Sequence, residues 1–578
     1  MSALDAGLGD LRALNRLAPP PAARLRTAVL LGALASASGV GLMAVSAWLI
    51  SRAAQHPQAA ALTLPAACVQ ALALGRALFR YLERLTSHDL AFRQLADLRV
   101  EVAERVEPLA PAGLAAFRRG DLLSTLVNDV DVQQDLTLRV IEPLTVCAVV
   151  GTLAVIATAC LLPVAGVVLA LVLGVAIIVA PVAHQRSARR ANAVLASRQA
   201  ALTDLVLESL RSAPDLAVNG ATDGWLRRLE HADDAIDDAT RRIGRANGTG
   251  AALSVLLGGV ALWTVAVVSV PAVRNGSLPG VALATLVLLP IALWESVTTV
   301  SPALSALDRV RASAGRLLRV LRAPNPVPDP PVPVALPAGA ATLELSQASA
   351  QWPLAADDPE GERPHGVAAV DLRLPPGRRV AVVGPSGAGK TTLVATLLRY
   401  VDVHAGRYDA NGVNVRTVEA SDVRDLIGHV SAEAHVFDST VRENLRFARP
   451  GASDDDLRQA ITAANLGHWF AGLPLGLDTW VGERGARMSA GERTRLSLAR
   501  ALLADRPILL LDEPTAGLDD AVASQVLDRL LSLPDRSVVL VTHRDPRPDQ
   551  VQQIITVDNG RITARTSGDA ITPDTGAD

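Results

Sequence analysis

Residues 384–392 read GPSGAGKTT and directly follow the apolar segment 378–383. The pattern G-x-x-x-x-G-K-[ST] between a strand and a helix is typical of a loop whose backbone N–H groups bind nucleotide phosphates. Glycines let the backbone approach the phosphate oxygens, and the next helix adds the positive end of its dipole. Lys390, the only lysine of the chain, is predicted to reach the β- and γ-phosphates. The predicted ATP-binding loop consists of Gly384, Pro385, Ser386, Gly387, Ala388, Gly389, Lys390, Thr391 and Thr392.

Two further apolar segments end in residues that suit phosphate chemistry. Residues 508–511 precede Asp512 and Glu513, and residues 538–541 precede Thr542 and His543. We expect Asp512, with Thr391 of the loop, to hold Mg²⁺, and Glu513 to act as general base on the attacking water. A histidine at a strand end is ordinarily structural. Its place after the third strand of this set favours a contact between His543 and the γ-phosphate.

A separate group of charged residues recurs at helical spacing. Arg76, Arg80, Arg84 and His88 follow one another every four residues, so they share one face of a predicted helix. Neighbouring cations repel unless they face water, lipid phosphates or an anionic ligand. The stripe therefore indicates either arginines that snorkel at a membrane edge or the wall of a transport cavity. Glu295 interrupts the last apolar segment, either as an intramembrane site or near its cytoplasmic edge.

Composition limits the classes of protein that can carry these residues. Half of the residues are apolar, the net charge is −3, and there are only three cysteines. These values exclude a disordered chain, a disulfide scaffold and a strongly basic nucleic-acid binder.

Long uncharged segments dominate the first 300 residues and predict six transmembrane helices. The predicted spans are about 27–51, 57–80, 140–161, 164–185, 246–271 and 276–300. Arginine-rich segments, 76–139 and 184–245, separate alternate spans, whereas the opposite loops carry little charge. The positive-inside rule then places both termini in the cytoplasm.

The chain is predicted to have two domains. Residues 1–322 form an all-α, six-helix transmembrane domain, and the proline-rich residues 323–340 form an extended linker. In residues 341–565, short apolar strands alternate with helical stretches, which indicates an α/β nucleotide-binding domain with a largely parallel sheet. Residues 566–578 are polar and acidic and are expected to be disordered.

With these motifs in place, the chain resembles the ATP-binding-cassette transporters. The run Ser489, Ala490, Gly491 and Glu492 is similar to the signature motif that completes the ATP site of a partner subunit. Trp352 lies where the family has an aromatic residue that stacks on adenine, and residues 516–519 resemble the D-loop. The segment 117–131 resembles the first coupling region of six-span exporters. The resemblance implies the type IV exporter fold and an ATPase coupled to transport.

A narrower resemblance lies in residues 80–88, 109–114 and 138–141, which are similar to the CydC subunits of heterodimeric CydDC transporters. It implies a CydD-like partner and a role in cytochrome bd assembly through movement of cysteine, glutathione or haem. His88 matches a family histidine implicated in haem ligation, with Arg84 one turn before it. The cationic stripe suits glutathione and haem equally, since both carry carboxylates.

Two positions depart from the family pattern. Ala432 stands at the usual glutamine of the Q-loop, beside Glu433, and Ala490 stands at a usual glycine of the signature. Two other interpretations of the whole chain remain open: an exporter of lipid or drug, and an ATP-gated channel or sensor built on the same cassette.

Overall fold

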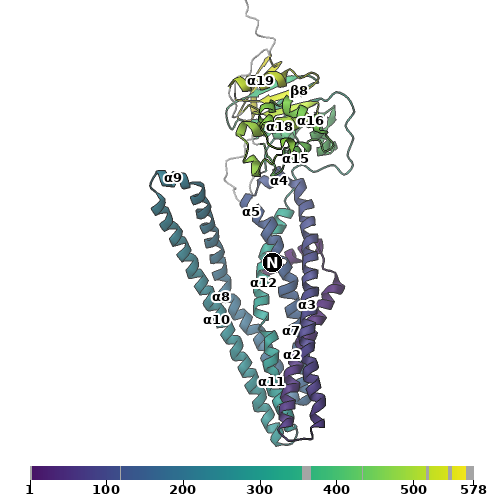
Figure 1. Cartoon of the computed structure of the whole chain (residues 1–578), viewed down its shortest axis with the longest axis vertical. Helices are drawn as coiled ribbons and strands as arrows, with labels where there is room; N and C mark the ends of the chain where they lie inside the picture. The colour runs from purple at the N-terminus through teal and green to yellow at the C-terminus, as the bar shows by residue number, and fades with distance from the viewer. Residues whose placement is uncertain are drawn as a thin grey trace, which may run out of the picture. The chain divides into compact units, whose positions relative to one another are not determined.

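The computed structural model describes residues 3–117, 119–353, 366–431, 434–515, 520–543 and 550–567. The chain divides into two compact units (Figure 1). One unit comprises residues 1–105 and 120–322, and the other comprises residues 106–119 and 323–578.

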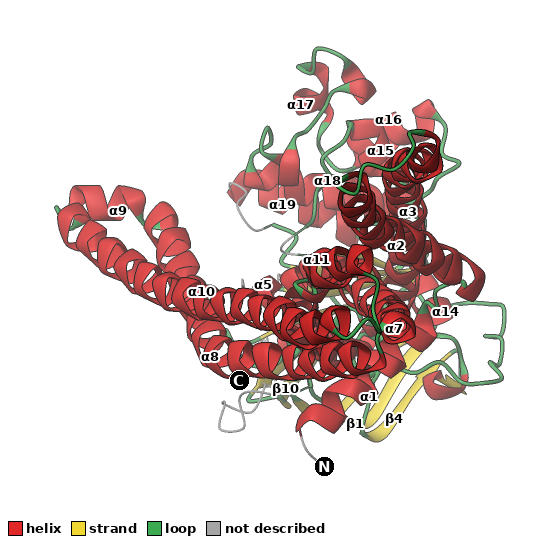
Figure 2. Ribbon diagram, turned by 90° about the horizontal axis from the view of Figure 1, so that it is seen from below, coloured by secondary structure: helices red, strands yellow, loops and turns green. Residues whose placement is uncertain are grey.

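The first unit is helical throughout its described residues. Its elements are α1 (Ala3–Leu17), α2 (Ala22–Ala53), α3 (Ala60–Val106), α5 (Arg119–Ser124), the π-helical η2 (Thr125–Asp129), α6 (Val130–Val132), the π-helical η3 (Leu136–Ile141), α7 (Glu142–Leu161), α8 (Pro163–Arg211), α9 (Ala213–Val218), α10 (Thr222–Arg274), α11 (Gly280–Val297) and α12 (Val300–Leu321). Helices α8 and α10 run side by side as a long pair that α9 joins (Figures 1 and 2).

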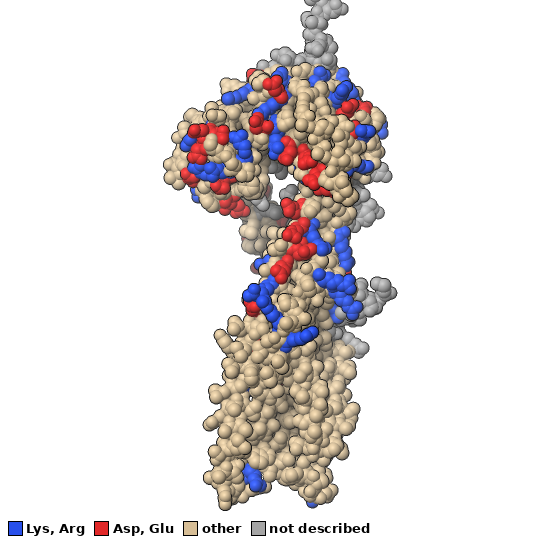
Figure 3. All heavy atoms as spheres, turned by 90° about the vertical axis from the view of Figure 1, so that its right-hand side faces the viewer, with Lys and Arg blue, Asp and Glu red and all other residues tan. Residues whose placement is uncertain are grey.

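Among the described residues, five helical stretches are long and apolar enough to cross a membrane. They are Ala22–Ala53, Ala60–Leu109, Gly120–Leu161, Thr222–Arg274 and Gly280–Leu321. The apolar stretch Pro163–Val179 is shorter, although α8 continues as helix beyond it. In the view of Figure 3, the lower part of this unit is almost free of charged side chains, as expected of helices that cross a membrane.

The structure differs from two of the predicted spans. The helix predicted from residue 57 begins at Ala60. The helix predicted over 276–300 is shorter in the structure, since α11 begins at Gly280 and ends at Val297, and α12 begins at Val300. At the break, the hydroxyls of Thr298 and Thr299 donate to the carbonyls of Glu295 and Ser296, at 2.8 and 2.7 Å. Threonine hydroxyls that bond to the local backbone compete with the helix, which hydropathy alone does not reveal.

The second unit contains two sheets. Their strands are β1 (Leu343–Ala350), β2 (Val367–Leu374), β3 (Arg379–Val383), β4 (Ala405–Ala410), β5 (Val413–Asn414), β6 (Ile427–Val430), β7 (Ile508–Asp512), β8 (Ser537–Val541), β9 (Gln553–Asp558) and β10 (Arg561–Ser567). The six-stranded sheet has the order β10-β9-β3-β8-β7-β6 and is parallel except for β10. A four-stranded antiparallel sheet, β2-β1-β4-β5, packs on the core that surrounds β3.

Helices contribute to two hydrophobic cores in this unit. The α-helices of the unit are α4 (Ala112–Ala115), α13 (Lys390–Leu397), α14 (Ala420–Asp425), α15 (Val441–Arg446), α16 (Asp454–Ala463), α17 (Gly467–Ala471), α18 (Ala490–Leu503) and α19 (Asp520–Leu531). A second core joins α15, α16 and α18 to β6, β7 and β8. The predicted fold class, a helical domain followed by an α/β nucleotide-binding domain, therefore describes the chain.

The boundary between the units is less simple than the predicted division at residue 322. Residues 106–119, which follow α3, belong to the second unit. Ala112 is buried in the same core as β1 and β3, and a Cβ on Gly113 would lie 3.2 Å from Pro326. Hydropathy cannot find such a segment, because it is defined by what it packs against and not by its composition.

The predicted linker, 323–340, contains no helix or strand. It is nevertheless held against the second unit, because Asp329 accepts a hydrogen bond from the Ala420 amide at 2.8 Å. The Val334 amide also donates to the Thr417 carbonyl, at 2.8 Å. At the other end, β10 includes the first two residues of the predicted tail, and residues 568–578 lie outside the described residues.

Candidate functional site

The predicted phosphate-site residues come together because three neighbouring parallel strands end side by side. Strand β8 lies between β3 and β7, with Val541 opposite both Val382 and Asp512. Beyond the strand ends, the Thr542 amide donates to the Val382 carbonyl at 3.1 Å, and the Glu513 amide donates to the Val541 carbonyl at 2.9 Å. The phosphate loop, the Asp512–Glu513 pair and His543 therefore share one edge of the sheet.

The phosphate loop itself depends on glycine where the backbone passes close to its neighbours. A Cβ on Gly384 would lie 2.2 Å from the Val557 carbonyl oxygen, so no larger residue fits there. Gly389 has a φ of 101° and forms the N-cap of α13. Pro385, Ser386 and Gly387 are exposed at the tip of the loop, where ligand access requires them to be.

The remaining loop residues divide into exposed and buried groups. The Lys390 Nζ atom donates to the carbonyls of Gly384 and Pro385, at 2.7 and 2.9 Å, so the ammonium group lies over the loop. Thr391 is exposed, whereas Ala388 and Thr392 are buried. The charge and the exposed hydroxyl that phosphate and Mg²⁺ would require thus lie on the open side of the loop.

The two carboxyls at the end of β7 differ in their surroundings. Burial raises the pKa of Asp512, the nearby Glu513 raises it further, and Lys390 opposes the shift. A buried carboxyl of this kind is stabilised in its ionised form by a cation, which fits the predicted Mg²⁺ ligand. Glu513 adopts a left-handed φ of 49°, a strained conformation for a residue with a side chain.

Glu513 and His543 contact each other directly. The His543 Nδ1 atom lies 3.2 Å from the Glu513 Oε1 atom, and the imidazole is 62% exposed. The two predicted catalytic side chains thus form one unit that faces the open edge of the sheet. A carboxylate oriented by an imidazole can accept a proton from water, which is the chemistry that the prediction required.

The signature residues form the first turn of a helix. Ser489 caps α18, since its hydroxyl accepts from the Glu492 amide at 3.3 Å and its own amide donates to Glu492 Oε2 at 2.8 Å. This reciprocal pair satisfies two backbone donors at the helix end. Ser489 and Ala490 are exposed, and Gly491 is buried. The exposed N-terminus offers free backbone donors to an anion from outside this chain.

Of the remaining nucleotide-site residues predicted from the sequence, only Trp352 lies within the described residues. Trp352 is half-buried and packs against the core beside the phosphate loop. The Q-loop pair, Ala432 and Glu433, and the D-loop, 516–519, lie outside the described residues.

The structure also reveals a residue that sequence reasoning missed. Arg500 of α18 donates to the carbonyls of Asn444 and His435, at 2.7 and 2.5 Å, and its guanidinium lies 5.7 Å from the centre of the Phe437 ring. Burial lowers the pKa of Arg500 to about 10. The signature helix is thereby tied to the segment that follows the Q-loop. Only its arginine type and its place three turns into α18 could have signalled this role.

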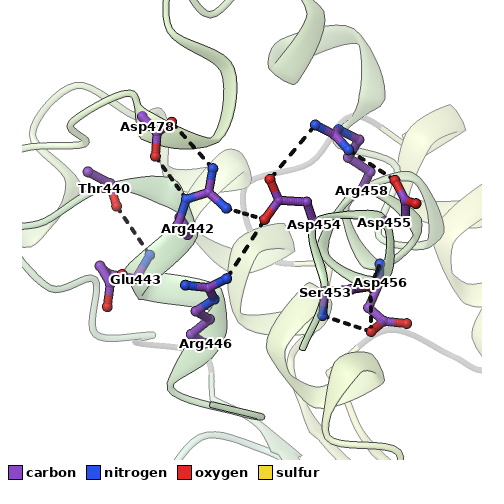
Figure 4. A network of polar contacts seen from close by, with 10 residues as sticks. All are labelled: Thr440, Arg442, Glu443, Arg446, Ser453, Asp454, Asp455, Asp456, Arg458 and Asp478. Atoms are coloured by element: carbon purple, nitrogen blue, oxygen red, sulfur yellow. Dashed lines mark hydrogen bonds and ion pairs between the residues drawn. The ribbon is translucent and has the colours of Figure 1, made fainter. Parts of the chain in front are cut away.

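An ion-pair network fixes the elements that precede the signature helix (Figure 4). Arg442 of α15 contacts Asp454, and its Nε atom lies 2.8 Å from Asp478. Arg458 pairs with Asp455 at 3.0 Å, and Ser453 caps α16 together with Asp456. The network joins α15, α16 and the turn at 476–478.

A second candidate site lies in the helical unit. A cavity of about 830 Å³ opens between α2, α3, η3, α7 and α11. The five predicted substrate residues all line it: Arg76, Arg80, Arg84, His88 and Glu295. The stripe on α3 is therefore a cavity wall, and the small residues of α2 opposite it, among them Gly32 and Gly39, provide the space.

The charge of the cavity differs from the expectation of a cationic strip. Its lining includes four arginines and, equally, four carboxyls. The carboxyls are Glu83, Asp135, Glu142 and Glu295, and the fourth arginine is Arg139. Arg76 Nη2 lies 2.9 and 2.8 Å from the two oxygens of Glu295, and Arg80 lies 3.9 Å from both Glu295 and Glu83. The repulsion along the stripe is thus reduced by carboxylates of the same chain.

The far end of the stripe has no such compensation. Over the described residues, no carboxylate lies within 4 Å of the Arg84 guanidinium or of His88. The His88 ring has Phe92 as its neighbour, with 5.9 Å between the ring centres. This end offers an imidazole, an arginine and an aromatic ring to a ligand.

Comparison with known proteins identifies the family of the chain. Residues 367–516 match the ABC transporter family. The chain is 31% identical, over 93% of both chains, to the Escherichia coli (strain K12) "Glutathione/L-cysteine transport system ATP-binding/permease protein CydC". The chain belongs to the ABC transporters of the CydC/CydD type.

Two other relatives extend this result. The "Glutathione/L-cysteine transport system ATP-binding/permease protein CydD" of Bacillus subtilis (strain 168) is 28% identical to this chain over 92% of both chains. A solved bacterial Atm1-family ABC exporter with ATP bound has the same fold, with a TM-score of 0.82 at 22% identity over 94% of this chain and 95% of that chain. As an ABC exporter of the CydC/CydD type, the protein binds ATP through its cassette domain, is a transporter ATPase, and is a membrane protein.

Proposed function

We propose that the protein is the CydC-like subunit of a heterodimeric transporter that moves cysteine and glutathione, haem, or both across the bacterial inner membrane for cytochrome bd assembly. The observation that carries the proposal is the cavity, in which Arg76, Arg80, Arg84 and His88 form one wall. Carboxylates are common to glutathione and haem, and arginine is the side chain best suited to bind them. The relatives that span nearly the whole chain are described as glutathione/L-cysteine transport proteins.

Haem is included because of the uncompensated end of the stripe. Neutral imidazole is an iron ligand, and an arginine one turn away can pair with a propionate. His88 and Arg84 supply this combination, and the Phe92 ring adds an apolar surface.

In the nucleotide unit, we assign Lys390 to the β- and γ-phosphates of ATP and Trp352 to the adenine ring. Thr391 and Asp512 would hold Mg²⁺, whose charge would offset that of the phosphates. Glu513 accepts the proton of the attacking water, and His543 orients the carboxylate and contacts the γ-phosphate. Their 3.2 Å contact supports this division of roles.

The signature residues, Ser489–Glu492, would complete the ATP site of a second half-transporter, because they form an exposed helix N-terminus, which suits a phosphate of the partner's nucleotide. We assign that partner to the CydD type. With the six predicted spans, both termini of this subunit would lie in the cytoplasm.

The test is vectorial transport by the heterodimer. The chain would be co-expressed with a CydD-like subunit, reconstituted into proteoliposomes, and supplied with glutathione, cysteine or haemin together with ATP. ATP-dependent accumulation of at least one of the three is expected. Flux that equilibrates the compound without ATP turnover would favour a channel, and accumulation of lipid or drug alone would favour the other type of exporter.

A further inference from the structure

The ion pair between Arg76 and Glu295 is open to solvent, unlike the pair between Arg316 and Asp129 of the same helical unit. In the pair of Arg316 with Asp129, the carboxylate is only 7% exposed and accepts two hydrogen bonds, at 2.8 and 2.6 Å. In the cavity, Arg76 and Glu295 are 45% and 59% exposed. Ion pairs of such exposure contribute little to stability, because water and salt compete for both partners. The cavity pair can therefore be exchanged for an external anion at small cost.

Glu295 also occupies the position that such an anion would require. One of its oxygens lies 2.9 Å from Arg76 Nη2 and 3.9 Å from Arg80 Nη2, so a single carboxylate bridges two successive turns of α3. This arrangement demonstrates that a carboxylate fits between these two guanidinium groups. The stem and guanidinium of Arg76 pack beside Gly39 of α2, where a Cβ would lie 3.4 Å from the Nε atom, so the arginine is held toward the cavity.

The carboxyls that line the cavity also bear on how an anion would bind there. Four carboxyls lie among the same lining residues as the four arginines, so an anionic cargo meets a cavity that already contains carboxylates beside its guanidinium groups. Glu83 and Glu142 are buried, which makes Glu295 the most accessible of the carboxyls in contact with the stripe.

We infer that Glu295 is an internal competitor for cargo: its carboxylate occupies Arg76 and Arg80 until a carboxylate of the cargo displaces it. This inference rests on the proposed function, because it takes carboxylate-bearing anions as the cargo class. Glu295 then sets the minimum affinity that a cargo needs in order to bind at Arg76 and Arg80. A compound must supply a carboxylate at Arg76 and Arg80 together with further contacts, such as those of Arg84 and His88, to outcompete it.

The experiment measures ligand binding to the purified heterodimer by calorimetry, with glutathione and haemin as probes. Their diethyl and dimethyl esters, which lack the carboxylate charges, are the matched ligand controls. Glu295→Gln should bind each acid about threefold to fivefold more tightly than wild type, the range expected when a half-exposed ion pair no longer competes. The affinity for the esters should not change.

Further variants locate the effect. Glu101→Gln removes the same charge from a half-exposed α3 pair with Arg105 that lies outside the cavity, and it should leave both affinities unchanged. Arg76→Gln should weaken binding of the acids. In a background of Arg76→Gln with Arg80→Gln, adding Glu295→Gln should have no effect, because the competitor and its target have both been removed.

The outcomes separate the inference from the proposed function. Equal binding of the acids by wild type and Glu295→Gln would overturn the inference and leave the cargo assignment standing. Binding of the acids by Glu295→Gln alone would support internal competition and overturn glutathione and haem as cargo of the native protein. Absence of binding in every variant would overturn both. Equal gains for acids and esters would also overturn the inference, because the effect would then not depend on carboxylate charge.

Discussion

The nucleotide-binding unit and the helical unit both place basic side chains beside carboxylates, but they do so by different means. In the nucleotide unit, Lys390, Asp512, Glu513 and His543 follow adjacent strands, and backbone hydrogen bonds fix their positions. In the helical unit, Arg76 meets Glu295, 219 residues away in the sequence, in an open cavity. The first arrangement is preorganised for one reaction, whereas the second can exchange one anion for another.

The largest expected effect tests the preorganised site. Glu513→Gln keeps the shape of the side chain but removes its basicity, so ATP should still bind while hydrolysis falls by about 10²-fold or more. ATPase activity of the heterodimer and binding of a fluorescent ATP analogue would be measured together. Because the partner's site can hydrolyse ATP independently, the measurement needs a partner whose own base has been removed. Near-normal turnover in that background would refute the assignment of Glu513.

The next effect tests the open end of the cavity. His88→Ala should abolish or shift the Soret band of haem bound to the purified heterodimer, since an iron ligand is lost. Arg84→Ala should weaken haem retention less, because it removes only a charge pair. Basal ATPase activity should survive in both. His231→Ala, which replaces an exposed histidine of α10, is the control. An unchanged spectrum in His88→Ala would leave a thiol as the better candidate cargo.

A third prediction compares two ion pairs of the helical unit, Arg316–Asp129 and Arg76–Glu295. Arg316→Ala leaves the buried Asp129 carboxylate without its bidentate partner, and we expect it to lower the free energy of unfolding by about 2–3 kcal/mol. Arg76→Gln should lower it by only about 0–1 kcal/mol, because the pair with Glu295 is half exposed. Thermal unfolding in detergent would rank the two variants. The same loss in both would mean that the cavity pair is structural and not exchangeable.

The difference between the two units also explains which features of the fold and of the sites could be predicted from the sequence. The phosphate loop, Asp512 and His543 are contiguous with the strands that place them, so local pattern was sufficient. The sequence also predicts that Arg76 to His88 share one helical face and that Glu295 interrupts an apolar segment, but it leaves open whether they line a cavity. Their mutual pairing was not predicted, since it depends on how α3 packs against α11. The break at Thr298 and the inclusion of residues 106–119 in the second unit were missed for the same reason: both follow from tertiary contacts.

The smallest predicted effect concerns a titratable group that the nucleotide unit buries without using it. His429 lies in β6, and burial lowers its pKa to about 4. Over the described residues, its Nε2 atom has no hydrogen-bond partner. The imidazole is therefore neutral in the folded protein at pH values where the unfolded chain, with a histidine pKa of about 6.5, already binds a proton.

The sign of the pH dependence follows directly. Between about pH 6.5 and pH 4 the unfolded state binds more protons at this residue, so its contribution to stability falls as the pH is lowered through that window. At pH 5.5 the loss is about 1 kcal/mol. His429→Leu should remove this part of the pH dependence, and His404→Leu, at an exposed position, is the matched control. Unfolding temperatures of the three proteins at pH 7.5 and 5.5 would measure the difference. If wild type and His429→Leu lose the same stability on acidification, the buried imidazole is not the group that titrates, and the carboxyls of the unit must account for the loss.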